Sequence, residues 1–91
     1  MDPKVYVAVD VFFLRDGTML PRRLTWEDGK HYDIDRVIAV RPAYAEKAGG
    51  MGDRYTVRIQ GQERFLFFEH ALDPQNHQVG RWFLERREEK K

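Results

Sequence analysis

The chain has 91 residues, 42% of them hydrophobic, which suffices for one domain with a modest core. It contains neither cysteine nor serine, which excludes disulfides, thiolate metal sites and catalysis by a serine or cysteine nucleophile. The net charge of +1 gives no overall reason to expect nucleic acid. Without a leader sequence or a long apolar run, we expect a soluble cytoplasmic protein.

The first half of the chain predicts a three-stranded meander joined by Asp-Gly turns. Between residues 5 and 14, apolar side chains recur at every second position, which is the pattern of a strand. A two-residue type I′ turn at Asp16-Gly17 places Val9 opposite Leu24, so that apolar residues meet on one face. The hydrophobic pattern therefore predicts both the strands and their register.

The second Asp-Gly pair requires a longer turn. A two-residue loop would place Leu24 opposite Asp33, whereas the three-residue loop Glu27–Gly29 places Leu24 opposite Tyr32. Gly29 then takes the left-handed position of a G1 bulge, so we expect one dipeptide to make two different turns. The core predicted for this half comprises Val7, Val9, Leu24, Trp26, Tyr32 and Ile34.

Two places disturb this pattern. Pro21 cannot donate a backbone hydrogen bond to a sheet, and Arg22 falls on the apolar face. We therefore expect a bulge or a bend near Pro21. The apolar phase also slips after Ile34, which predicts a second bulge near Asp35-Arg36.

The second half of the chain begins with a long connection at residues 41–53, in which Ala43–Ala48 could form one helical turn. Alternation resumes from Arg54 to Gln60, and Gly61 is expected to turn the chain. Two further apolar runs follow, and we interpret each of them as a strand.

About six strands and few helix signals predict an all-β protein. The expected fold is a small single-domain antiparallel barrel or a strongly bent meander sheet, similar to SH3 or OB barrels. We place the domain at residues 1–85 and a mixed-charge tail at residues 86–91.

The run Phe65–Phe68 is apolar on both faces, as in a central strand or a subunit interface. We expect a non-catalytic interaction module that binds a protein partner or forms a homodimer. The rival is a monomer in which the helical turn near Tyr44 covers the second face. The predicted interface residues are Phe65, Phe67, Phe68, Trp82 and Phe83.

Nucleic-acid binding is the alternative function. Small barrels bind nucleic acids with Arg on phosphates and aromatic rings beneath bases. The candidate residues are Arg23, Arg41, Arg54 and Arg58. Ordinary Arg–Asp pairs across a solvated sheet explain the same residues without a ligand.

A metal-assisted enzyme is the remotest alternative. His31, Asp33 and Asp35 alternate and can share one strand face, as oxygen and nitrogen metal ligands do. A solvated polar face opposite Tyr32 and Ile34 is the simpler interpretation. We expect no catalytic residue, no bound metal and no cofactor.

The segment from Trp26 to Val37 resembles a pattern in short bacterial proteins of unknown function, written W-x-x-G-x-x-Y-x-I/V-x-x-V. An Arg-Tyr strand and a closing Trp-Phe follow in that pattern, as Arg54-Tyr55 and Trp82-Phe83 do here. Some proteins of this kind are encoded near translesion DNA polymerases, so the resemblance implies an association with DNA repair. It assigns no catalytic residue.

Overall fold

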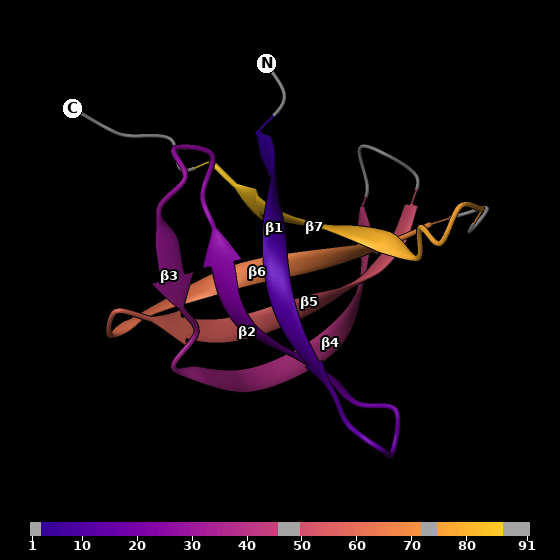
Figure 1. Cartoon of the computed structure of the whole chain (residues 1–91), viewed down its shortest axis with the longest axis horizontal. Helices are drawn as coiled ribbons and strands as arrows, with labels where there is room; N and C mark the ends of the chain where they lie inside the picture. Colours follow the sequence, from indigo (N-terminus) through magenta and orange to yellow (C-terminus); the bar gives the residue numbers. More distant parts are fainter. Residues whose placement is uncertain (1–2, 46–49, 72–74, 87–91) are drawn as a thin grey trace.

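All seven elements in the described part of the chain are strands of one antiparallel sheet (Figure 1). The computed structural model describes residues 3–45, 50–71 and 75–86. The strands are β1 (Lys4–Phe13), β2 (Met19–Thr25), β3 (His31–Asp33), β4 (Arg36–Ala45), β5 (Gly50–Ile59), β6 (Gln62–His70) and β7 (Gly80–Glu85). Their order in the sheet is β3-β2-β1-β7-β6-β5-β4. The predicted all-β fold is confirmed, and no described segment forms a helix that could cross a membrane.

The sheet curls because its two edge strands are consecutive in the chain. β3 and β4 lie at opposite edges of the sheet, yet only Ile34 and Asp35 join them. The Ile34 N–H donates to the Arg22 carbonyl at 2.8 Å, and the Asp35 N–H donates to the Arg58 carbonyl at 2.8 Å. These two bonds hold β2 and β5 near each other, and the result is a curled half-barrel (Figure 1).

The core lies on the concave face and is built mainly from β5, β6 and β7. Val57 and Leu66 are fully buried, and the Trp82 ring lies 5.1 Å from Tyr55 and 4.9 Å from Phe68. Of the core predicted from the first half, Leu24 and Ile34 are buried. The other four residues are half-buried and pack against this cluster: Val7, Val9, Trp26 and Tyr32.

Both Asp-Gly turns have the same geometry, which corrects the prediction for the first of them. The Gly17 N–H donates to Leu14 at 2.9 Å, and the Leu14 N–H donates to Thr18 at 2.7 Å. These bonds close a three-residue loop, with Gly17 at a φ of 94°. The predicted two-residue turn at Asp16-Gly17 is therefore wrong.

The second Asp-Gly turn has the predicted form. The Gly29 N–H donates to Trp26 at 2.9 Å, the Trp26 N–H donates to Lys30 at 2.8 Å, and Gly29 has a φ of 87°. A two-residue turn with positive φ at both positions occurs instead at Gln60-Gly61, where φ is 51° and 76°.

The bulge expected near Pro21 is present, and it restores the predicted register from Asp10 toward the start of β1, although the pairing between the turn and the bulge differs from the prediction by one residue. Asp10 pairs with Arg23 but Val11 pairs with Pro21, so Arg22 is the extra residue. This extra residue offsets the longer loop at Gly17. Beyond it Val9 pairs with Leu24, as the hydrophobic pattern predicts.

The second bulge lies at Ile38 rather than at Asp35-Arg36. Arg36 pairs in register with Arg58, and the shift occurs between Val37 and Ala39. The Asp35 N–H already donates to Arg58 of β5, so regular pairing of β4 with β5 begins at Arg36 and the register shift follows it.

The helical turn expected at Ala43–Ala48 is wrong for residues 43–45, because these residues belong to β4. Residues 46–49 lie outside the described part.

Replacing Gly17 or Gly29 by Val should destabilise the protein by a similar amount, about 1–2 kcal/mol each, because a side chain resists the left-handed conformation. No atom lies within 4 Å of the Cβ that either change adds, so the backbone alone sets the cost. Urea unfolding of both variants tests this, with Gly→Asn at the same positions as the better tolerated control. A large difference between the two Val variants would contradict the equivalence of the turns.

Trp82→Ala should cost about 3–5 kcal/mol, because the ring is buried between Tyr55 and Phe68. Trp26→Ala should cost less, since Trp26 is half-buried at the border of the core. Chemical unfolding of the two variants gives the order. The reverse order would mean that the core is centred on the β2–β3 hairpin.

Candidate nucleic-acid interface

The convex face of the barrel carries the side chains that alternate with the core residues. On β5, Tyr55 and Val57 point inward, so Arg54, Thr56 and Arg58 point outward. Directly paired residues of antiparallel strands share a face. One such row crosses five strands and consists of Tyr6, Phe83, Phe67, Arg54 and Arg41.

Two arginine pairs lie on the β4–β5 part of this face. Arg41 is directly opposite Arg54, and Arg36 is directly opposite Arg58. Like charges at directly opposed positions destabilise a sheet. The arrangement therefore has an electrostatic cost that an anion bound on this face would remove.

These arginines are poorly neutralised by the rest of the described residues. The single ion pair among them joins Arg58 Nη2 to Glu63 Oε2 at 3.5 Å. Within the described part of the chain, the side chains of Arg36 and Arg41 make no hydrogen bond or ion pair. The β4–β5 surface thus has an excess of positive charge, although the whole chain is almost neutral.

Aromatic rings adjoin the arginines on β6. The Arg54 guanidinium lies 4.5 Å from the centre of the Phe65 ring, and Phe65 remains 49% exposed. The Nε of Arg54 is buried with no hydrogen-bond acceptor among the described residues. Phe67 stacks in parallel on Phe83, with ring centres 4.9 Å apart. The surface thus offers both cationic donors and an accessible ring.

On the neighbouring part of the convex face, around β1 and β7, the cations are engaged by a carboxylate from β6. Glu69 accepts a hydrogen bond from the Tyr6 hydroxyl at 2.8 Å and lies 3.4 Å from Arg81 and 3.7 Å from Lys4. Burial raises the pKa of Glu69. The Tyr6 hydrogen bond and the two cations lower it by more than burial raises it, so the net shift of the pKa is downward. Glu69 is therefore charged at neutral pH, and both Lys4 and Arg81 lie within ion-pair distance of it.

The predicted nucleic-acid residues fall into two groups. Arg41, Arg54 and Arg58 come together on the β4–β5 surface. Arg23 lies on β2, where its guanidinium is 3.1 Å from the Asp10 carboxylate. Sequence reasoning also missed Arg36, because the position of the second bulge decides which face that residue occupies.

The predicted interface residues also separate. Phe68 and Trp82 belong to the interior core, and Phe83 is only 5% exposed although it is on the convex face. Lys4 and Tyr6 contact the Phe83 ring from outside. Phe65 and Phe67 keep exposed surface, so they alone of the five are available to a partner.

His31, Asp33 and Asp35 do not form a metal site. Thr25 Oγ1 and His31 Nδ1 lie 2.9 Å apart, and Asp33 is opposite Arg23. Over residues 3–45, 50–71 and 75–86, no three His, Asp or Glu side chains converge in a way that could hold a metal ion.

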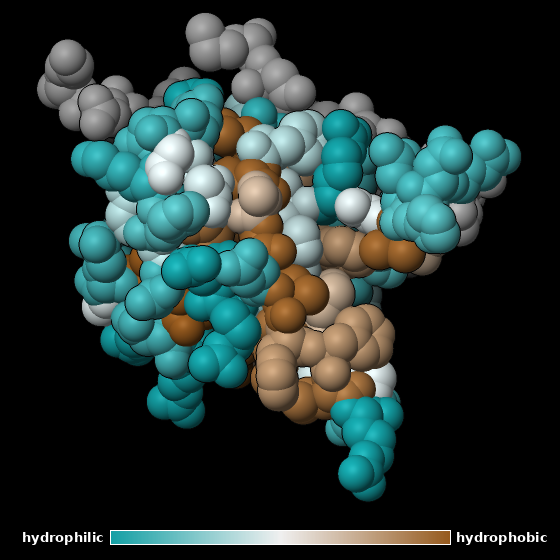
Figure 2. Space-filling view, viewed as in Figure 1, coloured by the Kyte–Doolittle hydropathy of each residue, from teal (hydrophilic) through white to brown (hydrophobic). Residues whose placement is uncertain are grey.

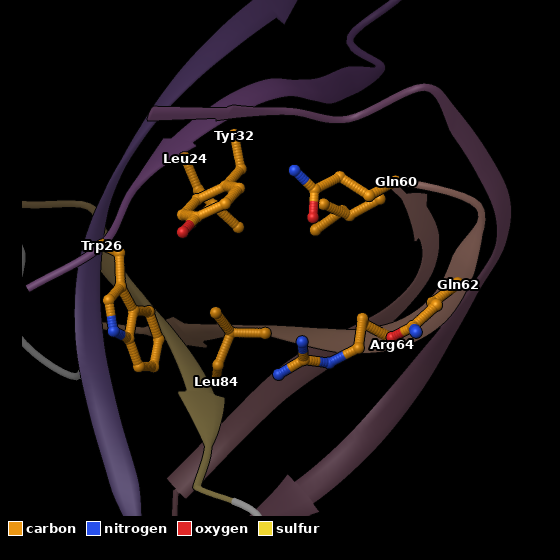
Figure 3. A pocket seen from close by; sticks show the side chains of 8 residues that line it. Leu24, Trp26, Tyr32, Gln60, Gln62, Arg64 and Leu84 are labelled. Atoms are coloured by element: carbon orange, nitrogen blue, oxygen red, sulfur yellow. The ribbon is translucent and has the colours of Figure 1, made fainter. Parts of the chain in front are cut away.

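A half-open hollow of about 230 Å³ lies at the end of the concave face (Figure 3). Leu24, Trp26 and Tyr32 line one side of it, and Leu84 lines another. The Arg64 guanidinium points into it, toward Leu84 (Figure 3). The residues that line the hollow form no grouping of catalytic side chains, so the arginine surface remains the better candidate for function.

Comparison of the chain with protein-family models, curated proteins and solved structures found no match.

Acid should destabilise the protein partly through Glu69. Its pKa is lowered from the ordinary value of 4.5, so its charged form stabilises the fold above pH 4.5, and this contribution is lost as pH falls through the lowered pKa. Glu69→Gln should be less stable than the unmodified protein at neutral pH, and the difference should shrink in acid. Urea unfolding at several pH values measures this, with Glu63→Gln as the control for loss of an exposed carboxylate. A difference that stays constant with pH would contradict the role of the network.

Proposed function

We propose that the protein is a non-catalytic module that binds single-stranded nucleic acid on the convex surface of β4, β5 and β6. The observation that carries the proposal is that two pairs of arginines are directly opposed, Arg36 with Arg58 and Arg41 with Arg54. Repulsion between them is relieved when phosphates bind, because each phosphate supplies a counter-charge, and among the described residues Glu63 alone provides one.

The aromatic residues favour a single strand over a duplex. Bases in a single strand have free faces that stack on exposed rings, whereas duplex bases already stack on one another. Phe65 is about half exposed, with the Arg54 guanidinium over its ring and the small residue Thr56 opposite it across the sheet. Phosphates on the arginines of β5 would bring bases over Phe65 and Phe67 on β6.

The arginine pairs are spaced for more than one phosphate. Arg54 and Arg58 are four residues apart on β5, which corresponds to about 13 Å in an extended strand. Phosphates two nucleotides apart can span such a distance. Ala39 and Thr56 form the pair between them and leave the backbone of the ligand room to approach.

Arg23 is outside the proposed surface. It is already paired with Asp10, and the chain from Asp33 to Asp35 lies between β2 and β4 with two exposed carboxylates. These acids repel a phosphate backbone.

The cytoplasmic location and the association with DNA repair stay predictions.

Fluorescence anisotropy with labelled single-stranded DNA, single-stranded RNA and duplex DNA tests the function. Single strands should bind most tightly at low salt. The double variant Arg41→Gln/Arg54→Gln should weaken binding. It should also lower the slope of log K against log salt by about 0.7 for each phosphate that the variant no longer neutralises.

The matched control is Arg15→Gln/Arg23→Gln, which removes the same charge from the β1–β2 hairpin and should leave most of the affinity intact. Failure of every oligonucleotide to bind at low salt would refute the function. Equal reductions of affinity in the two double variants would refute the site, since they would show a response to net charge alone.

A further inference from the structure

The β1–β2 hairpin projects from the barrel and carries consecutive apolar side chains that the other described residues leave exposed (Figure 1). Val11, Phe12 and Phe13 are 40%, 55% and 69% exposed. Because they are consecutive in a strand, they lie on both of its faces. Figure 2 shows apolar side chains gathered over this hairpin. Contiguous exposed apolar residues of this kind mark an interaction surface.

The same segment is an open edge of the sheet. β7 pairs with β1 only from Lys4 to Val7, and β2 occupies the other side of β1. Leu14 directs its N–H and its carbonyl toward β2. Alternation along the strand therefore directs the backbone groups of Phe13 and Val11 away from β2, toward the open side. Within the described residues, no backbone hydrogen bond joins that side to another strand.

The outer edges of the sheet are protected against pairing, and this edge is not. β3 has only three residues, and β4 is interrupted by the bulge at Ile38 and by Pro42. Short strands, bulges, prolines and charges are the usual means by which proteins block edge pairing. On the open part of β1 the one charge is Asp10, whose carboxylate is already engaged by Arg23 at 3.1 Å.

We propose that two copies of the chain associate by antiparallel pairing of their β1 edges, centred on Phe12. A two-fold axis between identical strands produces antiparallel pairing directly. In this register Phe12 faces Phe12 of the second copy, and Val11 faces Phe13 of the second copy. Apolar residues meet on both faces of the joined strands, and the backbone groups of Val11 and Phe13 find partners.

The exposed area matches a second copy of the chain. With about 200 Å² for each Phe and about 150 Å² for Val, the exposed fractions correspond to roughly 300 Å² per copy, or ~600 Å² for the pair. The smallest specific interfaces bury about 1,200 Å², of which roughly 56–65% is apolar. Three residues thus supply most of the apolar area that a small two-fold interface requires. We expect a dissociation constant for the dimer in the micromolar range.

Disulfide trapping tests the register, because the chain has no cysteine of its own. At a two-fold axis two Phe12→Cys residues form a pair without backbone hydrogen bonds between them, with Cα atoms about 4.5 Å apart, within the range of a disulfide. Mild oxidation should therefore yield a covalent dimer rapidly. Phe65→Cys replaces a ring of similar exposure on the convex face and should cross-link much more slowly.

Sedimentation velocity at increasing micromolar concentration tests the association itself. The unmodified chain should shift from 10.9 kDa toward twice that mass, and Phe13→Lys should remain monomeric with an unchanged far-UV spectrum. Phe65→Lys is the matched control and should still dimerise. A clean monomer of the unmodified chain at all concentrations would overturn the proposal. So would a dimer that Phe65→Lys disrupts and Phe13→Lys does not.

Discussion

Ile34 and Asp35 connect strands that lie at opposite edges of the sheet, and the architecture depends on this short connection. A flat sheet of seven strands would separate β3 from β4 by far more than two residues can span. The sheet must therefore curl, and the backbone bonds from Ile34 to Arg22 and from Asp35 to Arg58 hold it curled. The curl creates a concave face that is filled by the core and a convex face that is exposed.

The curl also explains why Phe65–Phe68 is apolar on both faces. Leu66 and Phe68 point into the core, whereas Phe67 lies on the convex face and stacks on Phe83. Tyr6 and Lys4 in turn contact Phe83. The convex face thus has a small aromatic cluster of its own, and the two-sided strand requires no partner to account for most of its apolar residues.

Charge is distributed unevenly over a chain that is nearly neutral. Near β1 and β7, Glu69 of β6 forms ion pairs with both Lys4 and Arg81. On the β4–β5 part, four arginines face one another in two pairs, and among the described residues Glu63 alone forms an ion pair with them. Net charge is a sum over the whole surface, so it conceals a local excess of this kind.

The sequence by itself determined the all-β class, most of the strands, the bulge near Pro21 and the register of β1 and β2 beyond it, because period-two alternation and turn residues are local signals. It did not determine that residues 41–45 form part of a strand. It did not determine the turn at Asp16-Gly17, since a longer loop with one bulge gives the same register as a shorter loop without one. Tertiary structure also decided which arginines meet. Arg36 and Arg41 reach the same face as Arg54 and Arg58 only because the bulge at Ile38 changes the phase of β4 between them, and the local hydrophobic pattern does not show where that bulge falls.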